Sequence, residues 1–246
     1  MSLHKDQAIV LSSRVFGESD KIVRFFTLHG GKLSGIAKGG KKSQKRFMNT
    51  LELFNVINLE YFEKSGSGLV RIDNADLVDA NMDLGSSFRK MCIASFFAEF
   101  VDKLTKEKER NTRLFHVLRN SLTTVKSVEL THSDIIYYEL QMLDHLGFLP
   151  NFRSCVQCGK DLFESELTSF SNERGGTLCP GCCRSVPHRT YPLGLIPKMT
   201  DKDMVCSLET GAFERHGREI LEGFISFHLN VEFKSYRLLK GIAGST

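Results

Sequence analysis

The stretch from residue 7 to residue 37, QAIVLSSRVFGESDKIVRFFTLHGGKLSGIA, decides how the first part of the chain folds. Three short runs rich in apolar and β-branched residues, 7–15, 22–28 and 32–37, are separated by turn-forming residues. Gly30 and Gly31 predict a tight hairpin turn between the second and third runs, because glycine adopts a positive φ without strain. The pattern therefore predicts three consecutive strands.

Two further strands are expected downstream. Residues 51–62 alternate between apolar and polar side chains, and residues 69–78 follow the turn-forming sequence at 66–68. Five short strands within about 75 residues are typical of a small barrel, and we expect the five-stranded oligonucleotide-binding type. An SH3-like barrel or half of a sandwich would give a similar pattern.

From residue 86 onward, apolar residues recur at intervals of three and four, which predicts helices. The expected helices cover 88–104, 114–125, 212–229 and a shorter segment at 233–239. Another helix is expected to begin after Thr131 or Ser133 as its N-cap and to end at Gly147. The fold class predicted is thus α+β with several domains, in which a five-stranded barrel precedes an α-helical domain.

The five prolines all lie at residue 150 or beyond, which marks a change from regular to looped structure. We expect an oligonucleotide-binding-type barrel domain at 1–80, a helical domain at 81–150 and 200–246, and a small module at 151–199 inserted into the helical domain.

The strongest motif is a pair of Cys-x-x-Cys sequences, Cys155–Cys158 and Cys179–Cys182, with 20 residues between them. Two intervening residues place both sulfurs of a pair on one side of a turn, as tetrahedral zinc requires. Four thiolates close the coordination shell, so the predicted Zn²⁺ is structural and not catalytic. Cys183 is an alternative to Cys182, which we prefer for its spacing.

A hairpin through Gly175 and Gly176 would make this module a zinc ribbon. The alternative of a redox dithiol requires a pair at a helix start in a βαβ setting, which the sequence lacks. Cys92 lies on an apolar helix stripe and Cys206 is isolated, so both are expected to be small core residues or unpaired.

The most biased charge pattern is the window 21–50, which holds eight basic residues and no acidic one. A basic, glycine-bearing loop on a small barrel can follow a phosphate backbone. The alternative is a solvated charge cluster. Phe25 and Phe26 are expected in the core, and Phe47 either in the core or stacked on a base. The predicted DNA-binding residues are Lys21, Arg24, Lys32, Lys38, Lys41, Lys42, Lys45 and Arg46.

No catalytic constellation is found, and we expect that the protein is not an enzyme. Residues 35–42 nearly match a phosphate-binding loop, but Lys42 stands where a Ser or Thr hydroxyl would hold Mg²⁺. Glu18 and Asp20 have no third acidic ligand nearby and are expected to cap a turn.

Composition agrees with a soluble globular protein, at 41% hydrophobic and 25% charged residues with a net charge of +4. No apolar run approaches the roughly 18 residues needed to span a bilayer. The first residues lack a secretory apolar region, so an uncleaved cytosolic protein without membrane partners is expected.

The whole pattern resembles the bacterial RecO family of recombination mediators. The resemblance runs in order through nearly the entire chain. In the N-terminal part it rests on Val10, Leu11, Gly17, Glu18, Ser19, Asp20, Lys21, Thr27, Gly31, Lys32, Leu33, Ala37, Lys38, Gly39, Ser43, Leu51, Glu52, Leu53 and Phe54. Further on it rests on Glu139, Leu140, Leu143, Leu146, Gly147, Phe148, Leu149, Pro150, Cys155, Cys158, Gly159, Phe170, Gly175, Gly176, Leu178, Cys179, Cys182, His228, Leu229, Lys234 and Ser235.

This resemblance implies an oligonucleotide-binding barrel, a helical domain and a zinc ribbon. It also implies binding to single- and double-stranded DNA, annealing of complementary strands, and contact with RecR and with the C-terminal tail of single-stranded DNA-binding protein. The expected outcome is loading of recombinase at gaps, in the bacterial cytoplasm at the nucleoid. The rival interpretations are an RNA-binding accessory factor of transcription or translation and a nuclease.

Overall fold

The computed structural model describes residues 2–43, 45–63, 68–162, 168–191 and 211–243. The chain divides into two compact units, Met1–Glu129 with Phe233–Thr246, and Leu130–Glu232. The predicted three-domain division remains a prediction. Among the described residues, no helix combines the length and the apolar character that crossing a membrane would need.

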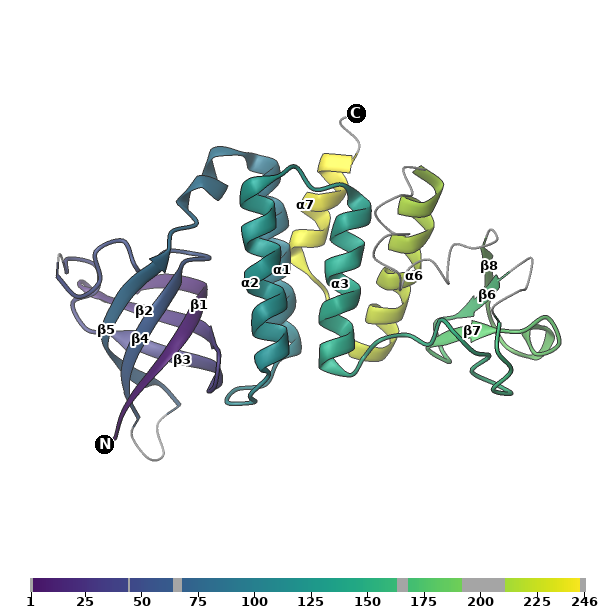
Figure 1. Ribbon diagram of the computed structural model, residues 1–246, viewed down its shortest axis with the longest axis horizontal. Helices are drawn as coiled ribbons and strands as arrows, with labels where there is room; N and C mark the ends of the chain where they lie inside the picture. Colours follow the sequence, from purple (N-terminus) through teal and green to yellow (C-terminus); the bar gives the residue numbers. More distant parts are fainter. Residues whose placement is uncertain (1, 44, 64–67, 163–167, 192–210, 244–246) are drawn as a thin grey trace. The chain divides into compact units, whose positions relative to one another are not determined.

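The first unit begins with a closed barrel of five strands, β1 (Ser2–Phe16), β2 (Asp20–Thr27), β3 (Gly31–Ala37), β4 (Val56–Glu63) and β5 (Val70–Asp79). Figure 1 shows it in purple and blue. The strand order is β1-β2-β3-β5-β4, with β1 pairing back to β4 and β3 running parallel to β5. The predicted oligonucleotide-binding barrel is therefore confirmed. Gly31, with φ of +70°, makes the predicted turn between β2 and β3.

Two strand boundaries differ from the sequence prediction. The strand expected at 51–62 begins only at Val56, because Phe54 adopts a φ of +68° and donates its N–H to the Val10 carbonyl at 2.9 Å. Strand β1 begins earlier than expected because residues 2–9 pair with β4. Residues 2–6 are mostly polar, so they carry no apolar strand signal.

The barrel has a filled interior and an outer face that is covered in part. Alternating residues of each strand point inward and pack into one apolar core. On the outer face, Ile9 and Phe26 are also fully buried, and the Phe26 ring lies 6.4 Å from the ring of Phe115 in the first unit. The interior core consists of Ala8, Val10, Val23, Phe25, Leu33, Ala37, Phe47, Leu51, Ile57, Leu59, Tyr61, Val70, Ile72 and Ala75.

Three helices of the first unit follow the predicted periodicity: α1 (Phe88–Leu104), α2 (Thr112–Ser127) and α7 (Lys234–Ala243). A short 3-10 turn, Met82–Ser86, precedes α1. The apolar stripe of α1 receives aromatic residues from the end of the chain. Phe233 stacks on Phe100 with ring centres 5.1 Å apart.

The carboxylate of Glu99 on α1 caps the start of α7. It accepts the backbone N–H groups of Lys234 (3.0 Å) and Ser235 (2.9 Å) and the Ser235 hydroxyl (2.5 Å). These donors have no partner within their own helix, and a negative charge is favourable at a helix N-terminus. Glu99 thus fastens the last helix to the first.

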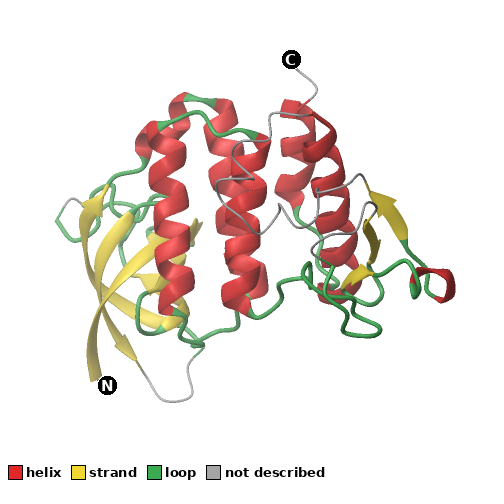
Figure 2. Ribbon diagram, turned by 45° about the vertical axis from the view of Figure 1, so that its right-hand side comes forward, coloured by secondary structure: helices red, strands yellow, loops and turns green. Residues whose placement is uncertain are grey.

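The second unit contains α3 (His132–Leu146) and α6 (Gly211–Leu229), which Figure 2 shows among the red helices. Thr131 is the N-cap of α3 and forms a capping box with Asp134, and Gly147 ends the helix in the left-handed region at φ +76°. Both termini of α3 are as predicted. A buried ion pair joins Glu139 of α3 to Arg218 of α6 at 2.5 Å.

A small sheet completes the second unit, with the order β7-β6-β8. Its strands are β6 (Thr168–Ser171), β7 (Gly176–Leu178) and β8 (Arg189–Tyr191). The predicted hairpin through Gly175 joins β6 to β7. The sequence did not predict β8, which is only three residues long.

Candidate metal centre and nucleic-acid interface

The four predicted cysteine ligands come together in the second unit. The sulfurs of Cys155, Cys158, Cys179 and Cys182 all lie within 4.8 Å of one another. Cys158 Sγ and Cys179 Sγ are 3.7 Å apart. Tetrahedral zinc with Zn–S bonds of about 2.3 Å would separate its sulfurs by about 3.8 Å. The spacing fits a four-coordinate metal ion.

Two tight turns position these sulfurs. In the first turn, the Gly159 N–H donates to the Cys155 carbonyl at 2.8 Å. In the second, the N–H groups of Cys182 and Cys183 both donate to the Cys179 carbonyl, at 3.0 and 3.1 Å. The Cys183 thiol donates instead to the Pro180 carbonyl at 3.2 Å. Cys182, and not Cys183, is therefore the fourth member of the cluster.

The small sheet and a few apolar residues support the cluster. Cys179 directly follows β7, and the Val156 N–H donates to the Thr177 carbonyl at 2.9 Å, which ties the first turn to β7. Leu162, Leu178 and Val186 pack around Cys155 and Cys179. The apolar cluster is small, so a metal ion bound to the sulfurs would add substantially to the stability of this module.

Hydrogen bonds within the cluster also shift the pKa values of its thiols. Burial by itself would raise the pKa of the Cys155 thiol, but the N–H of Cys179 and those of its own turn outweigh burial and lower the pKa to about 6. A hydrogen bond from the Cys182 side chain, followed by the Cys182 N–H, lowers the pKa of Cys179. Sharing its proton with Cys179 and Cys158 raises the pKa of Cys182 to about 12. Thiolate is the form that binds metal, so the cluster can hold a metal ion.

The other cysteines take no part in this centre. Cys92 is buried in α1, and burial raises the pKa of its thiol, as expected for a core residue. Cys206 lies outside the described residues.

Two of the predicted DNA-binding residues hold α1 to the barrel. Lys32 is 9% exposed, and its ammonium donates to the carbonyls of Asp102 and of Thr105, the latter at 2.6 Å. Arg24 forms an ion pair with the Asp102 carboxylate. The carbonyls at a helix C-terminus lack partners within the helix, so a cation there is stabilising.

Two other predicted residues are paired with carboxylates of the same unit. Lys21 lies 2.8 Å from Glu52, and Lys38 lies 2.7 Å from Asp20. Asp20 also accepts the N–H of Gly39 at 2.9 Å. The Lys38 ammonium, followed by the Gly39 N–H, lowers the pKa of the Asp20 carboxyl. Asp20 thus fastens the start of the loop that follows β3, whereas the sequence analysis expected it to cap the turn that leads into β2.

The remaining four, Lys41, Lys42, Lys45 and Arg46, are exposed. Among the described residues, the side chains of Lys41, Lys42 and Lys45 have no ion-pair partner. Arg46 donates to the Lys38 carbonyl at 3.0 Å, and its guanidinium lies 4.9 Å from the ring centre of Phe47. We call the segment 38–46 the basic loop. Its backbone is anchored to the β1–β2 turn, because the Lys41 N–H donates to the Ser19 carbonyl at 2.8 Å.

The structure also settles two alternatives in this window. Phe25 and Phe26 are fully buried and Phe47 is 3% exposed, so all three are core residues and none is open to a base. The segment resembling a phosphate-binding loop runs from inside β3 through the turn at 38–42, and no helix begins there. The basic loop therefore lacks the helix N-terminus that cradles phosphates in nucleotide hydrolases.

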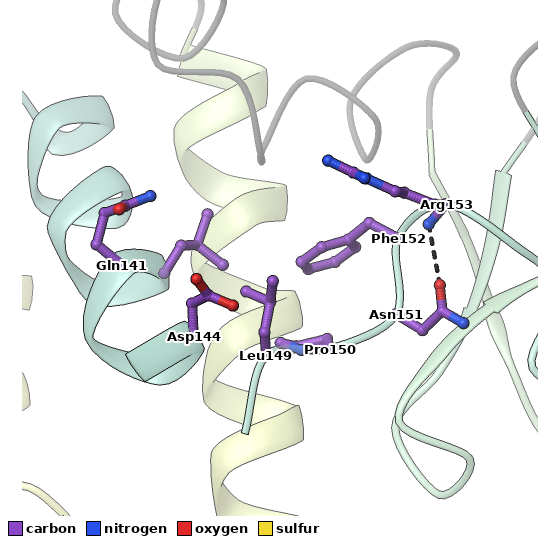
Figure 3. A pocket seen from close by; sticks show the side chains of 8 residues that line it. Gln141, Asp144, Leu149, Pro150, Asn151, Phe152 and Arg153 are labelled. Carbon is purple, nitrogen blue, oxygen red and sulfur yellow. Dashed lines mark hydrogen bonds between the residues drawn. The ribbon is translucent and has the colours of Figure 1, made fainter. Parts of the chain in front are cut away.

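A pocket of about 440 Å³ lies at the C-terminal end of α3, where the sequence had predicted no site (Figure 3). Leu140, Leu149 and Phe152 provide apolar walls, and Asp144 and the exposed Arg153 bring opposite charges. The sequence signal was present but not specific, because an apolar turn after a helix most often completes a core.

The fold and the cysteine cluster together define a protein of the oligonucleotide-binding-barrel class that carries a four-cysteine ribbon. Comparison with known sequences gives the family. The family model "Recombination protein O N terminal" matches residues 1–81, and "Recombination protein O C terminal" matches residues 85–237. The chain therefore belongs to the RecO family of DNA repair proteins, as the sequence resemblance indicated.

Similar proteins agree over nearly full length. The chain is 32% identical over 243 residues to "DNA repair protein RecO" of Thermoanaerobacter sp., covering 96% of each chain. It is 31% identical over 243 residues to the protein of the same name from Myxococcus xanthus, again covering 96% of each chain.

Proposed function

We propose that this RecO-family protein is a recombination mediator that binds single- and double-stranded DNA and anneals complementary strands. In this proposal it helps to load recombinase at gaps together with RecR and single-stranded DNA-binding protein. The observation that carries the proposal is the basic loop, whose three exposed ammonium groups have no partner among the described residues. Cations without protein partners are available to phosphates.

Annealing in this account requires no bond-making residue. Two DNA strands repel each other through their phosphates, and a protein that neutralises phosphates on both lowers that repulsion while raising the local concentration. If Lys41, Lys42, Lys45 and Arg46 neutralise about four phosphates, the logarithm of single-strand affinity should fall with the logarithm of salt concentration with a slope of roughly −2.8. We assign a structural role to Arg24 and Lys32, because their charged groups already bind Asp102 and Thr105 at the C-terminal end of α1.

The metal ion proposed for the four cysteines is Zn²⁺ in a structural role. Four thiol ligands without a histidine or carboxylate suit a soft or borderline tetrahedral ion, and four protein ligands leave no position for a substrate. The bound ion would brace the ribbon and take no part in DNA chemistry.

RecR and the C-terminal tail of single-stranded DNA-binding protein are the proposed protein partners. For the tail we propose the pocket at the end of α3. Support comes from its apolar walls, Leu140 and Leu149, and from exposed Arg153, which suits a terminal carboxylate. Binding of a tail peptide to the whole protein should weaken for Arg153→Glu, and unchanged binding would contradict this placement.

Strand annealing on DNA coated with single-stranded DNA-binding protein tests the proposal. The wild type should accelerate annealing, and the triple variant Lys41→Gln, Lys42→Gln, Lys45→Gln should lose most of that acceleration. A matched control removes two exposed lysines elsewhere, Lys106→Gln and Lys160→Gln, and should anneal as the wild type. Equal annealing by wild type and triple variant would contradict the role of the basic loop.

The rival function, an RNA-binding accessory factor, is not favoured, because both matching family models describe a recombination protein. Competition between single-stranded DNA and RNA of equal length separates the two. The mediator should retain DNA, whereas preferential retention of RNA would support the rival.

A further inference from the structure

The outer face of the barrel is covered over one half and open over the other. At the covered end, Ile9 and Phe26 are fully buried. At the other end, toward the β1–β2 turn, Arg14 and Phe16 of β1 and Arg71 of β5 are exposed. The sequence analysis assigned no role to any of these three residues.

The open half carries a continuous row of side chains across four strands. Arg14 pairs with Ile22, Ile22 with Ile36, and Ile36 with Arg71. Directly paired residues project from the same face of a sheet. At about 4.8 Å per strand, the two arginines stand about 14 Å apart along the sheet with two half-buried isoleucines between them.

Phe16 stands beside this row and next to the basic loop. Its side chain is 52% exposed at the last residue of β1, and it pairs with Asp20 across the turn. Asp20 holds Lys38, and the neighbouring Ser19 carbonyl accepts the Lys41 N–H. An exposed aromatic ring therefore lies where the basic loop joins the open face.

The arginines are placed to meet phosphates. Among the described residues, the Arg14 guanidinium has no carboxylate partner. The Arg71 guanidinium lies 6.0 Å from the ring centre of Phe62, a cation–π contact that orients it and leaves its N–H edges available. Planar guanidinium groups bind phosphate oxygens in pairs.

We infer that this open face is the binding site for a single DNA strand. Phe16 stacks on a base of that strand, and Arg14 and Arg71 bind phosphates on either side of it. The inference rests on the proposed DNA-binding function and explains why this face would bind single-stranded DNA better than duplex DNA. A free strand can turn a base onto an aromatic ring, whereas the bases of a duplex are already stacked and paired. The basic loop contacts phosphates of both forms, and Phe16 distinguishes them.

The natural absence of tryptophan gives a direct test in the full-length protein. Phe16→Trp introduces a single indole, and adding a thirty-residue oligothymidine should quench and shift its emission. The matched control is Phe88→Trp at the first residue of α1, where the side chain is 71% exposed, and its emission should not change. Phe16→Ala should weaken oligothymidine binding about 5- to 100-fold and duplex binding less than about twofold.

Three outcomes are distinguishable. Unchanged emission of Phe16→Trp, together with wild-type affinity of Phe16→Ala for oligothymidine, would overturn the inference while the triple lysine variant still tests the basic loop. Equal losses of single-strand and duplex affinity in a folded Phe16→Ala protein would also overturn it. Failure of the wild type to bind any DNA would refute the proposed function itself. Folding is checked by circular dichroism and thermal melting.

Discussion

The barrel and the ribbon are both built from short β-strands, but different forces hold them together. The barrel closes on itself around a large apolar interior that needs no ligand. The ribbon is a three-stranded sheet whose apolar cluster is small and is formed in part by its own cysteines. We therefore expect the ribbon to depend for its folding on a metal ion that joins its sulfurs. The comparison teaches that the candidate metal site and the proposed DNA contacts belong to separate parts of the protein.

The largest expected effect is the unfolding of the ribbon alone. Cys155→Ser removes one sulfur and leaves a buried hydroxyl, so the protein should lose its bound metal and the ribbon should unfold. Structural zinc contributes roughly 10–16 kcal/mol in isolated zinc-finger peptides, so little ribbon structure should survive. Elemental analysis and limited proteolysis within residues 151–191 measure the loss. Affinity for single-stranded DNA should remain, since the barrel has its own core, and a parallel loss would contradict the separation.

A smaller effect, on the free energy of unfolding, is expected at the contact between the barrel and α1. Lys32→Met keeps the length of the side chain but leaves the Asp102 and Thr105 carbonyls without their donor. The free energy of unfolding should fall by about 2–3 kcal/mol, measured by urea denaturation. Lys41→Met, in the exposed basic loop, is the control and should leave stability within about 0.5 kcal/mol of the wild type. Equal stability of the two variants would show that burial of Lys32 is not structural.

The cap on α7 gives a pH-dependent effect within the barrel unit. Burial alone would raise the pKa of Glu99, but the Ser235 hydroxyl and N–H, with the ammonium of Lys103 and the Lys234 N–H, outweigh burial and lower it. A lowered pKa in the folded state means that Glu99 contributes stability above its ordinary pKa of 4.5 and loses it as the pH falls through the folded value.

Glu99→Gln should therefore cost about 1 kcal/mol at pH 7, and the difference from the wild type should shrink below pH 4.5. Denaturation midpoints between pH 3 and pH 7 measure it. A difference that stayed constant with pH would contradict the ionised cap.

The smallest effect concerns Cys183, which neighbours the cysteine cluster in sequence but is not part of it. Cys183→Ser should leave metal content and stability unchanged within about 0.5 kcal/mol, because its thiol bonds to the Pro180 carbonyl and not to the other sulfurs. Cys182→Ser should behave like Cys155→Ser. Metal loss in Cys183→Ser with retention in Cys182→Ser would exchange their roles.

The sequence predicted the features that depend on local pattern. Alternation and turn residues predicted the barrel, apolar periodicity predicted α1 and α3, and the cysteine spacing predicted the metal cluster. These features can be recognised from residues close together in the sequence, without knowledge of tertiary contacts. Strand β8 was missed because three residues are too few to show alternation.

The sequence could not separate structural from available charges within the basic window. Lys32 and Lys41 are nine positions apart and look alike, but Lys32 meets α1 through residues about seventy positions away. Phe16 gave no signal either, because an apolar residue ending a strand usually packs inward. Such differences depend on tertiary contacts that no local window contains.

The most direct test of the central claim is the salt dependence of single-stranded DNA affinity, compared between the wild type and the triple variant Lys41→Gln, Lys42→Gln, Lys45→Gln. If each lysine neutralises one phosphate, the log–log slope should become shallower by about 2, with weaker binding to every sequence alike. The double variant Lys106→Gln, Lys160→Gln should keep the wild-type slope. An unchanged slope in the triple variant would contradict the claim that the lysines of the basic loop bind the phosphate backbone.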